Sequence, residues 1–375
     1  MPDARPVFEI GLVLLAAAIA GAASRRAGLP AVLGYLIVGL LIGPFTPGYV
    51  ADRHQIQVLA DVGVVLLLFE VGIELDLRAL RREPRSIVVA VPAQIAACVV
   101  VAVAALAMGG LPWQLGATVG LAVALSSSVV VVNMTRSRRR TLDDATARAL
   151  LVWAVLQDAV SVVAVPALAI ALSSDPTRLP LAVAKLAAFV AFAFVVHVLI
   201  APILLRRVQP QPDTFLVVAV SIALVTAGVG ALAFDVPVAL AAFVAGLALS
   251  LREEAREARR EILPFRDLFA VLFFVAVGSL VDPGLLPPNL AWFALALALV
   301  IVKGGLSAAL AALASVPARP LQLGVGLAQV GEFSFVVLGL GVAANVVTQG
   351  QFSAVLAAAA LSIAVSTVLV RVVRT

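Results

Sequence analysis

Long apolar runs follow one another along almost the whole chain, and each is ended by proline, glycine or a cluster of charges. Such runs predict helices that cross a bilayer, because about 20 apolar residues span its hydrocarbon core, and the chain holds about thirteen of them. The expected helices cover Val7–Ser24, Pro30–Gly43, Gln57–Leu75, Ser86–Met108, Gln114–Met134, Thr146–Leu172, Leu181–Leu205, Asp213–Phe234, Val236–Leu251, Pro264–Val281, Asn289–Ser315, Pro320–Val342 and Gln351–Val370.

Composition supports an all-α polytopic membrane protein. Of the 375 residues, 63% are hydrophobic and 13% are charged, and the mean hydropathy is +1.15. A water-soluble domain needs more polar residues than this to cover its surface, so the excess apolar surface must face lipid. No stretch is long or polar enough for a second, soluble domain. We therefore expect one transmembrane domain over residues 1–375, with no cytosolic nucleotide-binding domain.

The net charge of +5 would suggest a nucleic-acid partner in a soluble protein. Here the arginines lie in short loops between the apolar runs, and the expected partner is the lipid bilayer. The outward loops hold only Arg5, Arg53 and Arg178, with Lys185 near a helix end, if the N-terminus is outside. Basic loops face the cytoplasm, so the pattern predicts an inner-membrane, multi-pass protein with an outer N-terminus and an inner C-terminus.

Two parts of the chain resemble each other at an offset of 206 or 207 residues. The matched segments are Pro30–Leu33 with Pro237–Leu240, Val71–Gly72 with Val277–Gly278, and Gly120–Ala122 with Gly326–Ala328. The matched helices are seven apart, an odd number, so the two copies must be inverted relative to each other.

The second to sixth and the ninth to thirteenth of the expected helices form these predicted repeats. Repeat one covers about 30–172 and repeat two about 236–370, with linking helices at about 181–234. Inverted repeats are typical of secondary transporters, because exchange of the two repeat conformations opens a central site to either side.

A carboxylate is expected close to the middle of the membrane. Asp158 lies about 18 Å along its helix, at about 1.5 Å per residue, and follows Gln157. Ionisable groups at this depth are costly and usually functional. A carboxylate in a wet cavity holds either a proton or a dehydrated cation, and Gln157 offers a neutral carbonyl ligand. Asp158 is therefore the candidate binding group for a proton and for K⁺ or Na⁺.

Lys303 is expected at similar depth on another helix. It could neutralise Asp158 when no cation is bound. The alternative is that Asp158 and Lys303 form a buried pair that only holds two helices together, although such pairs stabilise proteins poorly.

Two matched helices carry polar residues at mid-depth. Ser126, Ser127 and Ser128 interrupt one, and the Gly331–Glu332 step interrupts the other. Transporters use broken helices to direct half-helix ends and free carbonyls at an ion. We therefore expect two discontinuous helices, with Ser127 and Ser128 at the site and Glu332 offsetting the positive ends of the helix dipoles. The alternative is a continuous helix whose serines bond to their own carbonyls.

Glu70 and Glu74 are four residues apart and share one helix face. Glu70 could line the ion path or could face a polar crevice beside Lys303, and Glu74 could lie at the entrance of the path.

Several segments together resemble the Kef-type branch of the monovalent cation:proton antiporters. They are Leu33–Pro44, Gly63–Phe69, Gly72–Asp76, Ala124–Ser128, Gln157–Asp158, Phe273–Gly278 and Gly331–Phe335. The resemblance runs over nearly the whole chain.

The resemblance implies a mobile core with two crossed discontinuous helices, and a scaffold that forms a homodimer. Asp158 matches the family's ion-binding aspartate, Gln157 the residue before it and Lys303 the basic partner. Relatives with two adjacent acids at this place tend to be electrogenic. Because Gln157 stands where they have the first acid, the resemblance implies electroneutral exchange. Potassium-efflux members usually continue into a nucleotide-binding domain, whereas this sequence stops at Thr375. A transporter-only member, a shortened chain and a subunit regulated by a separate cytosolic protein are the three expectations. Glu70 departs from the apolar residue expected at its position.

The expected function is secondary active antiport of K⁺ or Na⁺ against H⁺, without a cofactor. A sodium-coupled symporter of an organic anion on the same inverted-repeat plan is the alternative, but it would need a larger polar cavity. An intramembrane enzyme is disfavoured, because the chain has no HExxH motif and only two histidines.

Overall fold

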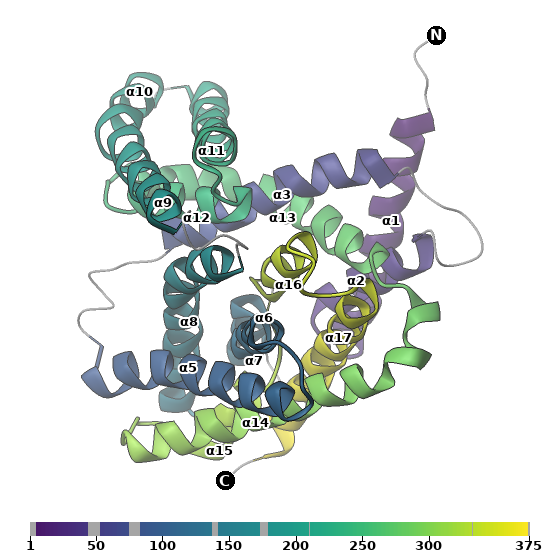
Figure 1. The fold of residues 1–375 in the computed structure, drawn as a ribbon. Coiled ribbons are helices and arrows are strands. Elements are labelled where there is room, and N and C mark those ends of the chain that lie inside the picture. Colours follow the sequence, from purple (N-terminus) through teal and green to yellow (C-terminus); the bar gives the residue numbers. More distant parts are fainter. Residues whose placement is uncertain are drawn as a thin grey trace. The chain divides into compact units, whose positions relative to one another are not determined.

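A computed structural model describes residues 5–43, 53–74, 83–136, 142–172, 179–209, 211–331 and 333–373. Every regular element among these residues is a helix (Figure 1), which confirms the predicted all-α class. The α-helices are α1 (Arg5–Arg26), α2 (Ala31–Ile42), α3 (Arg53–Glu74), α5 (Arg85–Met108), α6 (Trp113–Ala124), α7 (Ser128–Arg136), α8 (Asp144–Ala171), α9 (Leu179–Phe194), α10 (Ala201–Val208), α11 (Pro212–Phe234), α12 (Val238–Leu249), α13 (Ala255–Ser279), α14 (Leu290–Leu313), α15 (Pro320–Leu327), α16 (Phe333–Ala343) and α17 (Gln349–Val372). The remaining helical segments are η2 (Val195–Ile200), η3 (Pro283–Leu285) and η4 (Pro287–Asn289).

The chain is a multi-pass membrane protein. In the part of the chain that the structure describes, nine helices are long and apolar enough to cross a bilayer, and three shorter apolar helices accompany them. The expected total of thirteen spans and the orientation of the termini stay predictions.

The structure corrects one predicted boundary. The helix expected from Pro264 begins at Ala255, so α13 also includes the charged run before Pro264. Ala258 and Ile262 are completely buried. They lie on one face of the helix at a spacing of four residues, and this narrow apolar stripe is hidden in the sequence by the surrounding arginines and glutamates.

By its internal contacts the chain divides into two compact units. Unit 1 comprises residues 1–14, 51–79 and 165–276, and unit 2 comprises residues 15–50, 80–164 and 277–375. Within unit 2, α6 lies at the centre, with α5, α14 and α16 packed against it (Figure 1). Unit 2 therefore holds both predicted helix interruptions.

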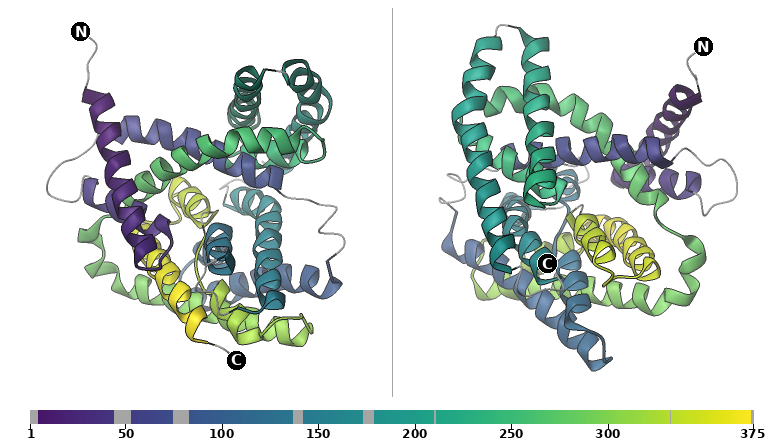
Figure 2. Two further views of the ribbon diagram at one scale, coloured as in Figure 1. Left: turned by 180° about the vertical axis from the view of Figure 1, so that it is seen from behind. Right: turned by 45° about the horizontal axis from the view of Figure 1, so that its top comes forward.

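Unit 1 contains α3 and a long helical segment, residues 179–208, that packs beside α11. Figure 2 shows this long antiparallel pair, in which α9, η2 and α10 form one rod. Within η2 the backbone widens to a π-helix, and the Ala201 amide donates to the Val196 carbonyl five residues earlier. Pro202 follows directly and lacks an amide hydrogen, which explains why regular α-helical bonding fails here. His197 on this turn is buried, and its Nε2 lies 3.0 Å from Thr226 Oγ1.

A polar cap in unit 2 begins α8, the helix that carries Asp158. The Thr146 amide donates to Asp143 Oδ1 at 2.7 Å, and Arg319 Nε lies 3.0 Å from Asp143 Oδ2. The hydrogen bond from the Thr146 amide is the main reason that the pKa of Asp143 lies below its usual value. The charged cap thus fixes the start of the helix.

Replacing Asp143 with alanine should lower the stability of the protein by about 1 kcal/mol, because the α8 amides lose their acceptor. Because the folded-state pKa of Asp143 is lowered, its contribution is complete above the ordinary aspartate pKa of about 3.9 and is lost as the pH falls through the folded-state pKa. Thermal unfolding in detergent at several pH values measures both effects. Asp143→Asn is the control, since asparagine also caps helices; equal losses in both variants would contradict the capping role.

Candidate functional site

The centre of unit 2 is an interrupted helix. Helix α6 ends at Ala124 and α7 begins at Ser128, with residues 125–127 in extended or irregular backbone. The predicted interruption at the serines is therefore confirmed. It exposes the carbonyls at the end of α6 and the amides at the start of α7, which a continuous helix would pair internally.

A second interruption separates α15, which ends at Leu327, from α16, which begins at Phe333. The two interruptions bond to each other. The Gly331 amide donates to the Leu125 carbonyl at 2.9 Å, and Ser126 Oγ donates to the Leu327 carbonyl at 3.0 Å. We call this region, residues 125–127 and 328–331, the crossing.

The side chain of Gln329 connects the two helix interruptions at the crossing. Its Oε1 accepts from the Ser127 amide at 3.0 Å, and its Nε2 donates to the Ser127 carbonyl at 3.2 Å. Gln329 is completely buried. Gln329 thus pairs the buried Ser127 amide, whose partner a continuous helix would supply, and it adds a second donor to the Ser127 carbonyl, which also accepts from the Val131 amide at 3.1 Å.

The two backbones approach so closely that residue 331 must be glycine. A Cβ at Gly331 would lie 2.6 Å from the Ser126 carbonyl carbon and 2.7 Å from the Ser127 amide nitrogen. Real Cβ atoms do not approach backbone this closely. Any side chain at this position would therefore push the two interruptions apart.

We expect Gly331→Ala to destroy the crossing and abolish the activity of the protein, because the clash is with backbone and cannot be relieved by a rotamer change. Gly339→Ala is the matched control: Gly339 lies in the adjoining helix α16, and no atom lies within 4 Å of the position that its added methyl group would occupy. Both variants are compared with the wild type by their cation-driven proton flux in proteoliposomes, which is the expected activity, and by their thermal unfolding. Full activity of Gly331→Ala would contradict the role of the close approach.

Gln157 and Gln94 support the first interruption from α8 and α5. Gln157 Oε1 accepts from the Ser126 amide at 3.0 Å. Gln157 Nε2 donates to Gln94 Oε1 at 2.6 Å and to the Ala124 carbonyl at 3.0 Å. Trp153 Nε1 donates to the same Gln94 oxygen at 3.4 Å. The Gln157 amide therefore ties α8 to the end of α6, so that the next residue of α8 is held beside the interruption.

That next residue is Asp158. Its side chain is almost completely buried, with 2% of the residue exposed, and its own carbonyl accepts from Ser161 Oγ at 2.7 Å. A carboxylate removed from water in this way is costly unless a cation or a proton neutralises it. Asp158 is therefore the candidate group for binding a cation or a proton.

Lys303 lies on α14 in the same unit and is completely buried. Its Nζ donates to the Gln329 carbonyl at 2.7 Å. The positive charge therefore sits on the second interruption. Ser307 follows one turn later on the same face; it is buried, and its Oγ has no hydrogen-bond partner among the described residues. This hydroxyl can accept a bond from a water or bind an ion.

The other expected residues of the site have different positions. Ser127 is 5% exposed and lies in the crossing, and Ser128 begins α7. Ser127 Oγ accepts from the Val130 amide at 3.3 Å, which caps α7. Glu332 lies outside the residues that the structure describes.

Glu70 belongs to unit 1, where it is completely buried against two arginines of α13. Its Oε1 lies 2.6 Å from Arg259 Nε, and its Oε2 lies 2.8 Å from Arg266 Nη1. Glu74 is half exposed and lies 2.8 Å from Arg259 Nη2. Each carboxylate oxygen of Glu70 is thus paired with one guanidinium group. This ion pairing connects α3 to α13.

Sequence reasoning missed Gln94, Gln329 and Ser307. All three lie in apolar surroundings and were absorbed into predicted helices. A usable signal did exist, because an amide or hydroxyl inside an apolar span is itself unusual and commonly bonds to a neighbouring helix. Among the described residues, no group of three or more His, Cys, Asp or Glu side chains could hold a metal ion.

Comparison with known proteins gives a match to the family model "Sodium/hydrogen exchanger, transmembrane" over residues 13–374. The chain is 34% identical over 373 residues to YbaL of Escherichia coli (strain K12), whose name assigns it to cation/proton antiporters; the match covers 96% of this chain and 66% of YbaL. It is 32% identical over 381 residues to the glutathione-regulated potassium-efflux system protein KefC of Enterobacter sp. (strain 638), covering 98% of this chain and 60% of KefC.

A solved structure, the sodium proton antiporter MjNhaP1 from Methanocaldococcus jannaschii at pH 8, shares the fold. The TM-score is 0.72 with 16% sequence identity, and the match covers 99% of this chain and 96% of that one. The chain thus spans about two thirds or less of the length of the curated relatives, but nearly all of the solved structure.

Proposed function

Because the chain belongs to the sodium/hydrogen exchanger transmembrane family, we propose that it exchanges a monovalent cation, K⁺ or Na⁺, for protons across the cell inner membrane. One observation carries the proposal. A buried aspartate, Asp158, follows the residue that fixes the first helix interruption, in a unit whose only described buried lysine, Lys303, bonds to the second. The names of YbaL and KefC agree with this reaction class.

The proposed mechanism is competition for Asp158. When Asp158 is ionised, it attracts a dehydrated cation, and the carbonyls freed at the crossing replace part of the hydration shell. When Asp158 is protonated, its charge is gone and the cation is released. Gln157, Ser127 and Ser128 are the proposed neutral ligands. Lys303 stabilises the ionised carboxylate when the cation is absent, and Glu332 offsets the positive helix ends.

Alternating access by two inverted repeats is the proposed route of transport. A pair of equivalent close contacts supports the repeats. A Cβ at Gly72 would lie 2.3 Å from the Phe243 carbonyl oxygen in unit 1, and a Cβ at Gly278 would lie 2.3 Å from the Leu36 carbonyl oxygen in unit 2. Gly72 corresponds to Gly278, and Leu36 to Phe243, at the offsets found in the sequence. The same contact therefore recurs with the repeats exchanged.

The number of spans, their orientation, the moving part, the oligomeric state and the stoichiometry are proposed from the sequence pattern and the family resemblance. The chain forms about thirteen spans with the N-terminus outside and the C-terminus inside, and unit 2, with the crossing, is the moving part. Unit 1 forms a homodimer. Gln157 provides no second ionisable group beside Asp158, so one cation is exchanged for one proton without net charge movement.

Proton flux in proteoliposomes tests the function. With a pH gradient reported by a dye, addition of K⁺ or Na⁺ should collapse the gradient, whereas the bulky cation choline should leave it intact. The rate of collapse caused by Na⁺ should be the same with and without a clamp of the membrane potential at zero by valinomycin and equal potassium on both sides, as expected for electroneutral exchange. A gradient that none of the alkali cations dissipates would refute the proposed function. Transport that itself generates a membrane potential would refute only the stoichiometry.

A further inference from the structure

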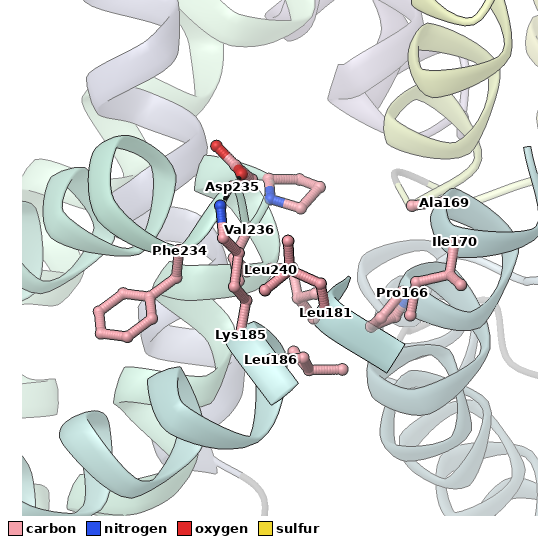
Figure 3. Close-up of a pocket in the computed structure, with 11 residues that line it drawn as sticks. Pro166, Ala169, Ile170, Leu181, Lys185, Leu186, Phe234, Asp235, Val236 and Leu240 are labelled. Atoms are coloured by element: carbon pink, nitrogen blue, oxygen red, sulfur yellow. Dashed lines mark hydrogen bonds and ion pairs between the residues drawn. The ribbon is translucent and has the colours of Figure 1, made fainter. Parts of the chain in front are cut away.

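Unit 1 contains a cavity of about 320 Å³ between the end of α8, the start of α9 and the turn from α11 to α12 (Figure 3). Its size is at the lower end of the range of small-ligand sites, about 300–1,000 Å³. The lining is apolar except for two side chains. It consists of Pro166, Ala169, Ile170, Leu181, Lys185, Leu186, Phe234, Asp235, Val236, Pro237 and Leu240.

The surroundings of the cavity are those of a surface in contact with lipid. Leu181 in the lining is 57% exposed, and Leu232 and Val238 beside the lining are 89% and 39% exposed. In a chain that spans the membrane, exposed apolar side chains of this kind face acyl chains. Phospholipid is therefore the molecule present at the highest concentration next to the cavity.

The two polar side chains form an ion pair of opposite charges at the rim. Lys185 Nζ donates to Asp235 Oδ2 (Figure 3). Both remain accessible, with 36% of the Lys185 side chain and 74% of the Asp235 side chain exposed. Asp235 ends α11 in the left-handed conformation, and Lys185 lies about 9 Å from the start of α9 at about 1.5 Å per residue. The charges thus lie near helix ends, where lipid headgroups are expected.

We propose that this cavity binds one phospholipid with a zwitterionic headgroup that contains a primary amine. One acyl chain occupies the apolar cavity over Leu240 and Leu186. The lipid phosphate binds the Lys185 ammonium, and the lipid ammonium binds the Asp235 carboxylate, so the headgroup extends the existing ion pair into a ring of four alternating charges.

The paired charges favour this lipid over two common alternatives. An anionic headgroup, such as phosphatidylglycerol, offers nothing to the accessible Asp235 carboxylate and is repelled by it. A choline headgroup carries the positive charge but has no N–H with which to donate to the carboxylate. Charge-assisted hydrogen bonds are roughly twice as strong as neutral ones. One additional bond of this kind should give phosphatidylethanolamine about a tenfold advantage.

Native mass spectrometry of the full chain tests the proposal. Delipidated protein in detergent is titrated with phosphatidylethanolamine, phosphatidylcholine or phosphatidylglycerol of identical acyl chains. We expect one phosphatidylethanolamine to bind about tenfold more tightly than either of the others. Leu186→Trp, which fills the cavity, should remove this lipid, and Lys185→Ala should weaken binding of all three.

Asp235→Asn is the decisive variant, because asparagine tolerates the left-handed conformation of residue 235. It should abolish the preference for phosphatidylethanolamine over phosphatidylcholine and leave the fold intact. Asp213→Asn, at the opposite end of the same helix α11, is the matched control and should change nothing. Equal binding of the three lipids, a preference for phosphatidylglycerol, or a preference that survives Asp235→Asn would overturn the proposal.

Discussion

Replacing Asp158 with asparagine should reduce cation-driven proton flux at least a hundredfold. Asparagine has nearly the same shape but can neither lose a proton nor balance the charge of a dehydrated cation. Loss of one member of a buried charge pair costs about 3–5 kcal/mol, which corresponds to a factor of about 10²–10³ in affinity. The proteoliposome assay with a pH-sensitive dye measures the flux directly.

The matched control is Asp144→Asn. Asp144 begins the same helix α8 but is exposed to solvent, so its replacement should leave flux unchanged. Both variants should elute as wild type on size exclusion, since Asp158→Asn removes a buried charge rather than packing. Transport by Asp158→Asn at the wild-type rate would assign the ion site to another residue.

Replacing Glu70 with alanine should destabilise the protein by about 3–5 kcal/mol, because it leaves the guanidinium groups of Arg259 and Arg266 without their buried partner. Alanine also leaves a cavity at a completely buried position. Thermal unfolding in detergent should show a large drop in the unfolding temperature, together with a low yield of folded protein.

Glu74→Ala is the control for Glu70. Glu74 contacts the same Arg259, but half of its side chain is exposed, and exposed ion pairs contribute only about 0–1 kcal/mol. If Glu70→Ala unfolds at the wild-type temperature and instead abolishes transport, Glu70 lines the ion path and its pairing with α13 is secondary.

The helices themselves could be predicted because apolar runs in membranes are long and their ends are marked by proline, glycine or charge. The interruption of α6 was also predictable, because three consecutive serines at mid-depth are unusual in an apolar helix and a matched interruption was expected in the other repeat. The equivalent break before α16 followed from the repeat. These features depend on residues that are close together in the sequence.

Tertiary partners could not be predicted in the same way. Gln157 remains a proposed carbonyl ligand, since an amide oxygen has two lone pairs, but its protein partners had no signal in the sequence. Its Oε1 accepts from the Ser126 amide, and its Nε2 bonds to Gln94, which lies 63 residues away. Lys303 was expected to neutralise Asp158 when no cation is bound, which stays a prediction, but its hydrogen bond to the Gln329 carbonyl was not foreseen. No pattern of neighbouring residues predicts either set of hydrogen bonds, because each depends on the approach of helices that are distant in sequence.

Glu70 illustrates the same limit. Its position inside an apolar run left open whether it lines an ion path or faces a polar crevice. Its two guanidinium partners come from α13, whose charged first half was not predicted to be part of that helix. Only the packing of α3 against the inward face of that helix reveals that the charges are paired.

Release of protons on cation binding tests the central claim most directly. Purified protein in detergent, in weakly buffered solution, is mixed with K⁺ or Na⁺ over a series of pH values while a pH indicator records released H⁺. Competition for one carboxylate predicts about one proton released per cation bound at acidic pH, a decline as the pH rises, and no release from Asp158→Asn. Cation binding without proton release in the wild type, or equal release from Asp158→Asn, would contradict the account.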